Sequence, residues 1–233
     1  MKWLLLSLLM FIYTAGFSQA TYFVDRVPKR IPTEIYDIPN RITLNIAKYT
    51  KVTTGSAYFN EEWMRAVVNI TDTTIAKNVR VRLDLLDGSL EFQNDKGEEL
   101  VAATPVYSVL LIDSATGQRY TFIPSSRITK ANNKAWYQVL SSGEKITLLK
   151  EYFKELVENN HYATPQTGLE IRTTEKYFVM IDNNLTRVKK LSDITGLAGD
   201  KAELLKKFAD KNDLSMRRET DLVTFIEYYH TLK

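Results

Sequence analysis

The amino-acid chain has 233 residues, with 31 lysines and arginines against 28 aspartates and glutamates, and no cysteine. A chain of this length can bury a substantial core as one or two domains. The net charge of only +3 at pH 7 argues against a nucleic-acid-binding protein, which concentrates basic residues, and the lack of cysteine excludes a thiol nucleophile, a Cys-ligated metal and a lipid-modified cysteine.

Residues 1–20 have the composition of a secretory signal peptide. A short basic start is followed by an almost unbroken apolar run over residues 3–13, and the small residues Ser18 and Ala20 lie at the positions that signal peptidase requires. The run is shorter than the roughly 20 apolar residues of a spanning helix. We therefore predict cleavage near Ala20 and an exported, periplasmic or secreted chain with no transmembrane segment in its mature part.

The next segment, residues 21–40, is predicted to be an irregular N-terminal arm. Its prolines, Pro28, Pro32 and Pro39, are too closely spaced for a helix or a central strand. Alternation of hydrophobic and polar residues begins directly after this arm.

Residues 41–190 have the pattern of an antiparallel β domain. The clearest strand covers residues 79–85, where hydrophobic and polar residues alternate, as in a sheet with one buried and one solvated face. Asp87-Gly88 then provides hairpin-turn chemistry, and residues 90–92 begin the return strand.

The same strand and turn rhythm recurs along the domain, about every ten residues and without long intervening helices, which favours a meander over βαβ units. We expect an α+β, mainly β fold: an antiparallel β-meander forming a curved sheet, a sandwich or a partial barrel. The other candidate strands are residues 42–47, 57–59, 64–70, 106–112, 119–123, 135–140, 146–149, 177–181 and 186–191.

One segment, residues 149–157, fits two structures. Its hydrophobic residues lie on one face of a helix, whereas the strand before it favours continuation. We predict a helix by a narrow margin, and a loop over residues 161–174, which include Pro165 and Gly168.

The C-terminal part, residues 191–233, is predicted to be a helical hairpin packed on the β domain. One helix is expected over residues 200–211 and a second amphipathic stripe over residues 222–229. Asp213 or Ser215 is a candidate N-cap of the second helix.

The segment from Gly55 to Trp63, GSAYFNEEW, resembles a motif of uncharacterised exported proteins of Bacteroidota. In those proteins a strand pair like residues 79–92 follows the motif, and the chain closes like residues 206–232, with its adjacent tyrosines. The resemblance extends over most of the mature chain. It implies an envelope or secreted location in a Gram-negative cell, and it implies no activity and no site residue.

Two histidines and one serine-lysine spacing are the first candidates for chemistry. Neither His161 nor His230 has a second ligand three or four positions further along a helix, so both are predicted to be surface histidines. Ser142 and Lys145 match the spacing of penicillin-binding enzymes. They lie between predicted strands, with Gly143 where a tight turn favours a positive φ, so we predict a hairpin turn.

Carboxylate pairs and aromatic residues give no clearer site. The adjacent glutamates at 61–62 and 98–99 point to opposite faces in a strand, and Asp84 and Asp87 flank a turn, where we expect them to be solvated or to cap it. The tryptophans and tyrosines, including Trp63 and Trp136, are predicted to be core or half-buried sheet residues rather than a sugar platform. Residues 196–199 are predicted to be a loop and not a phosphate site.

With no catalytic, metal or cofactor residue to name, we predict a non-catalytic envelope or secreted binding protein, whose partner is a protein, a glycan or a lipid. One alternative is a periplasmic carrier of a lipid or other hydrophobic ligand, which requires an apolar cavity of at least about 300 Å³. A second is a hydrolase whose carboxylates meet only in the fold, in a cleft with shifted pKa values. A binding protein should present a flat aromatic patch or an exposed sheet edge.

Overall fold

The computed structural model describes residues 48–103, 105–128, 134–159 and 168–232. The predicted signal peptide, the predicted arm over residues 21–40, the candidate strand over residues 42–47 and His161 lie outside the described residues.

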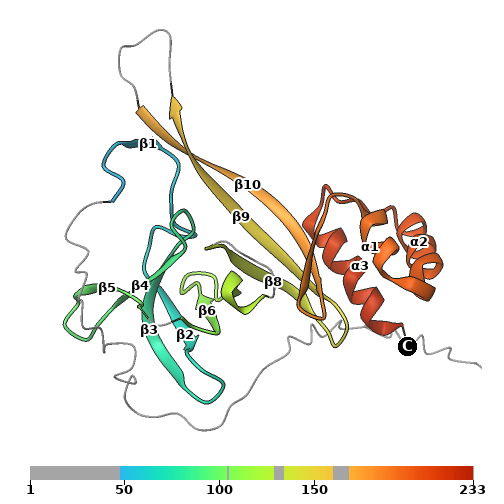
Figure 1. Cartoon of the computed structure of the whole chain (residues 1–233), viewed down its shortest axis with the longest axis horizontal. Coiled ribbons are helices and arrows are strands. Elements are labelled where there is room, and N and C mark those ends of the chain that lie inside the picture. The colour runs from blue at the N-terminus through green and yellow to red at the C-terminus, as the bar shows by residue number, and fades with distance from the viewer. Residues whose placement is uncertain (1–47, 104, 129–133, 160–167, 233) are drawn as a thin grey trace, which may run out of the picture.

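In the described ranges, eleven strands form one large, mainly antiparallel sheet that is not closed into a barrel, within the mainly β fold class that the sequence predicts (Figure 1). The strands are β1 (Val52–Thr54), β2 (Met64–Asn69), β3 (Ile75–Asp84), β4 (Ser89–Gln93), β5 (Glu99–Val101), β6 (Ser108–Ile112), β7 (Arg119–Pro124), β8 (Trp136–Ser142), β9 (Thr147–Asn159), β10 (Gly168–Ile181) and β11 (Asn184–Val188).

The sheet consists of two meanders joined by one pairing. Strands β2 to β5 pair consecutively, strands β6 to β11 pair consecutively, and β2 pairs antiparallel with β6 where the two meanders meet. The exception is β1, which pairs parallel with the start of β10 at the far edge of the sheet. The chain must therefore cross from that edge to the middle between β1 and β2.

Strand β3 confirms the alternation seen in the sequence. Val79, Val81 and Leu83 are each at most 2% exposed, and the turn after the strand uses Gly88 at φ 76°, a conformation that glycine adopts at no steric cost. Of the two roles predicted for Asp84, solvated or capping the turn, the structure shows the second. Its side chain is fully buried because Tyr49 and the turn backbone supply its hydrogen bonds.

The segment over residues 149–157 is strand and not helix. It belongs to β9, which pairs with β10 along its whole length, and β10 begins at Gly168 inside the predicted loop. Pairing with β10 along the whole segment, and with β8 as far as Glu151, overrides the local helical pattern.

The β9–β10 hairpin has two parts, which we name by their neighbours. The near half, Thr147–Glu151 with Lys176–Ile181, lies between β8 on one side and β11 on the other. The far half, 152–159 with 168–175, extends beyond β8 and projects from the body of the sheet (Figure 1).

Among the residues that the structure describes, three α-helices follow the sheet, where the sequence predicts two. They are α1 (Leu191–Leu197), α2 (Ala202–Lys211) and α3 (Glu219–Thr231), with short 3-10 turns at Ser125–Arg127 and Gly199–Lys201. Helix α1 replaces part of a predicted strand and loop. It forms because Asp193 accepts hydrogen bonds from the backbone N–H groups of Lys189 and Lys190, and because Ile194 is fully buried.

The predicted caps of the last helix are wrong. Helix α3 begins at Glu219, with Arg218 in the N-cap position. Its first turn is held by Asp221, whose carboxylate accepts hydrogen bonds from the Ser215 backbone N–H at 2.9 Å and from the Arg218 side chain at 2.7 Å.

Three apolar clusters stabilise the molecule. The largest lies among β2, β3, β4 and β6. The second joins the helices to one face of the near half, through Leu148 and Val179 on the sheet and Leu205, Leu222 and Phe225 on the helices. The third lies on the opposite face and includes Tyr137 and Leu149. Neighbouring residues of β9 thus enter different cores, so the near half is buried on both faces.

Candidate functional site

The segment Gly55–Phe59, which we call the strap, carries the chain from the edge of β10 to β3. Gly55 lies against the backbone of Ile171 in β10: a Cβ there would be 2.0 Å from the Ile171 carbonyl oxygen, and the residue has φ 84°. Further along, the backbone N–H of Phe59 donates to the Leu83 carbonyl at 2.9 Å and that of Leu85 to Ala57 at 2.8 Å. The strap therefore ties the far half of the hairpin to the first meander.

Aromatic side chains hold the strap in place. The ring of Phe59 packs edge-on against Tyr120, Phe122 and Tyr152, with ring centroids 4.9 to 5.5 Å apart. Tyr58 lies over the guanidinium of Arg82, 4.1 Å from ring centroid to Cζ. The GSAYFNEEW motif is thus a packing element. Trp136, in β8 and 6% exposed, confirms the prediction of a buried sheet residue. Trp63 is half-buried on the same Arg82 at 4.6 Å, but it lies just before β2 and not in a strand.

Asp84 and Asp87 belong to a charged cluster at the β3–β4 turn. Lys48 Nζ lies 2.7 Å from Asp87 Oδ2 and 3.1 Å from Glu91 Oε1, and Arg82 Nη2 lies 2.8 Å from Glu91 Oε2. Asp84 caps the turn by accepting the Leu86 and Asp87 backbone N–H groups, which confirms its predicted capping role.

The carboxylates of this cluster have different pKa directions. Burial raises the pKa of Asp84 more than the Tyr49 hydrogen bond lowers it. Burial also opposes the charge of Asp87, but the bonds from Lys48 and Ser89 outweigh it and hold its pKa below the usual range. Glu91 is fully buried and bonded to both Lys48 and Arg82. Every carboxylate here is engaged with a cation or a turn, so the cluster fixes the turn and offers no free acid or base.

Ser141 is the serine that lies beside a histidine and a carboxylate. Its Oγ donates to Glu227 Oε1 at 2.6 Å and lies 3.3 Å from His230 Nε2, both on α3. A catalytic triad instead has the histidine between the serine and the acid. Here both groups contact the serine, which is only 5% exposed. The arrangement fastens the end of α3 to β8.

The turn over Ser142–Lys145 is a hairpin connection, as predicted, closed by a hydrogen bond from the Gly143 N–H to the Ile146 carbonyl at 3.1 Å. The expected positive φ at Gly143 is wrong. The glycine is needed because a Cβ at this position would lie 2.2 Å from the His230 ring. His230 is therefore a half-buried packing residue and not the free surface histidine that the sequence predicts.

A second charged cluster joins α3 to the near half. Lys150 Nζ lies 2.7 Å from Glu219 Oε2 and 2.8 Å from Glu175 Oε1, and its side chain is 8% exposed. Burial opposes the charge of Lys150, but the hydrogen bonds to these glutamates outweigh it and raise its pKa. The cation is thus fully engaged by the helix and the neighbouring strand.

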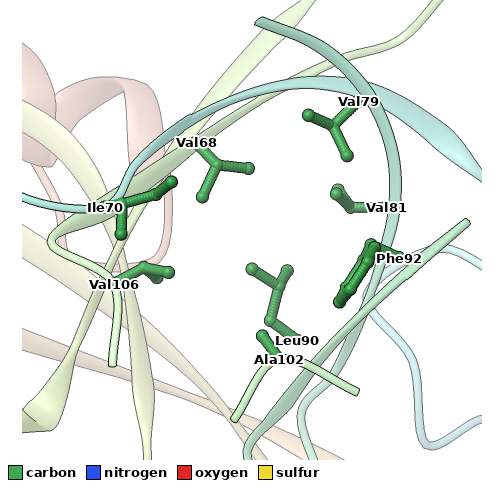
Figure 2. A pocket seen from close by; sticks show the side chains of 8 residues that line it. All are labelled: Val68, Ile70, Val79, Val81, Leu90, Phe92, Ala102 and Val106. Atoms are coloured by element: carbon green, nitrogen blue, oxygen red, sulfur yellow. The ribbon is translucent and has the colours of Figure 1, made fainter. Parts of the chain in front are cut away.

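An apolar cavity lies inside the first meander, where side chains from β2, β3 and β4 converge (Figure 2). Its volume is about 10 Å³, which is room for about one water molecule. A space of this size holds no acyl chain. The residues that line it are Val68, Ile70, Val79, Val81, Leu90, Phe92, Ala102 and Val106.

The far half of the hairpin offers a different kind of surface. In the part of the chain that the structure describes, β9 has no strand partner on its outer side beyond Glu151. Two large hydrophobic side chains on this stretch are exposed: Phe153 at 37% and Leu156 at 46%. An open edge presents unpaired backbone N–H and C=O groups to a partner strand.

Comparison with known proteins identifies no relative: no family model, no curated protein sequence and no solved structure matches the chain. Among the described residues, no group of three or more histidines, cysteines, aspartates or glutamates is arranged to hold a metal ion. No helix in the described ranges is long and apolar enough to cross a membrane.

The sequence of the open edge fits both a helix and an exposed strand. Residues 152–158 carry two strand-forming aromatic residues and one β-branched residue, Val157, and they also carry charges at three positions. That mixture resembles a helix face, whereas charged residues on an exposed strand are also typical of a sheet edge.

Proposed function

We propose that this protein is an exported, non-catalytic interaction protein of the cell envelope, and that it binds a protein partner along the open edge of β9. The observation that carries the proposal is the far half of the hairpin. Its outer edge, Tyr152–Glu158, combines unpaired backbone with the exposed side chains of Phe153 and Leu156.

The rigidity of the far half supports this role. Lys154 Nζ donates to the Ser56 carbonyl of the strap at 2.8 Å, and Gly55 packs on Ile171. Because the strap holds the far half of the hairpin against the first meander, the edge is preorganised, and a partner strand does not have to order it. Addition of a strand to such an edge is a common mode of peptide recognition.

The engagement of the buried polar groups also favours binding over catalysis. The cations Lys48, Arg82 and Lys150 contact carboxylates, and Ser141 donates to Glu227. No buried side-chain nitrogen or oxygen in the described ranges lacks a hydrogen-bond partner. The signal-peptide pattern of residues 1–20 supports the exported location.

The proposal is tested by immobilising the purified chain and measuring the capture of components from an envelope extract. We expect binding that is abolished when the extract is treated with protease, and lost when Phe153 and Leu156 are both replaced by lysine. The matched control replaces Leu197 and Leu204, which are 40% and 46% exposed on α1 and α2, by lysine and should bind like the wild type.

Two outcomes contradict the proposal. One is binding that survives the edge substitutions but is lost in the helix control. The other is binding that survives protease and is reproduced by purified glycan or by vesicles of envelope lipid. Circular dichroism of both double variants verifies that each remains folded.

A further inference from the structure

The outer strand of the far half has a self-complementary side-chain pattern. Lys154, Leu156 and Glu158 are two residues apart, so they lie on the same face of β9. In a second, antiparallel copy of the strand these three residues run in the opposite order. The negative end of each strand then lies opposite the positive end of the other, with a hydrophobic residue at the centre. This is what an antiparallel copy of the same strand requires.

A two-fold axis perpendicular to the sheet pairs two such edges antiparallel. Equivalent faces of the two sheets then lie on the same side of the combined sheet. With the axis at Leu156, Leu156 lies opposite Leu156 of the second copy. Lys154 then lies opposite the second copy's Glu158, and this contact occurs twice. On the other face Glu155 lies opposite Val157, so this register places no like charges together.

Two neighbouring registers are less favourable. An axis at Glu155 places two glutamates directly opposite each other, and an axis at Lys154 does the same with two lysines. Like charges in cross-strand positions are destabilising. Among these three registers, the charge pattern therefore selects the one centred on Leu156.

The state of Lys154 and Leu156 in the single chain is consistent with this pairing. The Lys154 ammonium donates to a carbonyl oxygen and forms no ion pair within the described part of the chain. Burial lowers its pKa more than the more distant Glu61 and Asp84 raise it. Leu156, at 46%, is as exposed as any large hydrophobic side chain in the described ranges. A carboxylate beside Lys154 would offset the cost of burying its charge. An apolar contact for Leu156 would remove the cost of leaving its side chain in water.

We propose that a second copy of this chain is a partner of the open edge, joined through antiparallel β9 strands with Leu156 on the two-fold axis. The inference rests on the proposed function, since it names the occupant of the edge described there. The two sheets become continuous across the dimer, in the order β10, β9, β9 and β10.

The charge pattern allows a sharp test by sedimentation of the purified chain over a series of concentrations. Lys154→Glu and Glu158→Lys each place like charges opposite each other twice, and each should raise the dimer dissociation constant about tenfold. An equimolar mixture of the two variants restores two opposite-charge contacts and should regain the wild-type association. Glu155→Lys is the matched control, because its opposite residue, Val157, carries no charge.

A cross-linking test locates the axis. The chain has no cysteine, so Leu156→Cys introduces a single thiol that lies opposite its own copy, where Cβ atoms are about 5 Å apart and close to disulfide reach. Mild oxidation should convert this variant to a covalent dimer at least tenfold faster than Leu204→Cys. Leu204 has the same 46% exposure and lies on α2.

The outcomes separate this inference from the proposed function. A chain that remains monomeric at all concentrations, with Leu156→Cys oxidising no faster than Leu204→Cys, overturns the dimer. If the same chain still captures an envelope protein through the edge, the proposed function survives with a different occupant. A mixture of the charge variants that does not recover association also contradicts the register.

Discussion

The two halves of the β9–β10 hairpin consist of the same two strands but have different surroundings. In the near half Leu148 packs under the helices, Leu149 enters the core on the opposite face, and Lys150 bridges two glutamates. In the far half one face is crossed by the strap, and the outer edge of β9 has no neighbouring strand in the described ranges.

The difference shows how one hairpin can be anchored in the sheet at one end and leave an edge open to a partner at the other. The near half derives its stability from burial, because both faces and both edges are occupied. The far half derives its order from the strap and from its continuity with the near half, so its outer edge stays available. Substitutions at equivalent positions in the two halves should therefore have very different effects.

The largest contrast is expected between Leu148→Ala and Leu156→Ala. Leu148 is fully buried between the sheet and the helices, whereas Leu156 is 46% exposed. The first change should lower the free energy of unfolding by about 3 kcal/mol through lost burial and a cavity, and the second by less than about 1 kcal/mol. Urea denaturation of dilute protein measures both. Equal losses would contradict the exposure of the far half.

The strap is tested by Gly55→Ala, with Gly97→Ala as the matched control. Both glycines have a positive φ, 84° and 78°, but a Cβ at Gly97 meets nothing within 4 Å, whereas at Gly55 it would meet the Ile171 carbonyl oxygen. The control should cost about 1 kcal/mol from backbone strain alone.

Gly55→Ala should cost about 1 to 2 kcal/mol more, because a backbone carbonyl cannot move aside like a side chain. Faster hydrogen exchange should appear in the far half and not in the near half. If the two variants lose equal stability, the close approach of the strap to β10 does not hold the far half in place.

Local patterns predicted those parts of the fold that local chemistry decides. Alternation over residues 79–85 and the Asp87-Gly88 turn suffice to define β3 and its hairpin, because one face is buried along the whole strand. In β9 the alternation is lost, since Leu148 and Leu149 are both buried in the near half while Phe153 and Leu156 are both exposed in the far half. A pattern that depends on where neighbouring strands end is invisible in the strand's own sequence.

The site depends on contacts between distant parts of the chain, which one sequence does not reveal. The GSAYFNEEW motif was recognisable, but its role as a strap depends on Ile171 and Lys154, which lie far along the chain. The burial of Asp84 depends likewise on Tyr49. Gly143 was correctly placed in a turn for an incorrect reason, because the His230 ring that excludes a side chain there comes from α3.

A smaller contrast is expected for two lysines on the same face of β9. Lys150→Met removes the cation that joins Glu175 and Glu219. It should lower the free energy of unfolding at pH 7 by about 1 to 2 kcal/mol, because the two glutamates then face each other without it. Lys154→Met removes a charge whose burial is not offset by an ion pair, so its effect should stay within about 0.5 kcal/mol. Urea midpoints provide the comparison, and a larger loss at Lys154 would reverse our interpretation of the two halves.

The two lysines should also differ in the sign of their pH dependence. The raised pKa of Lys150 means that its stabilisation is fully present below the unfolded-state pKa, about 10.4, and is lost as pH rises through the folded-state pKa. The lowered pKa of Lys154 means that the folded state releases this proton first, so its unfavourable contribution fades as pH rises toward about 10.4.

The stability difference between wild type and Lys150→Met should therefore be constant from pH 7 to about 10 and shrink above it. The difference between wild type and Lys154→Met should shift in favour of the wild type as pH rises toward about 10.4, and stay constant above that pH. Urea midpoints measured across this pH range test both predictions. If the two stability differences changed with pH in the same direction, the two lysines would share one environment.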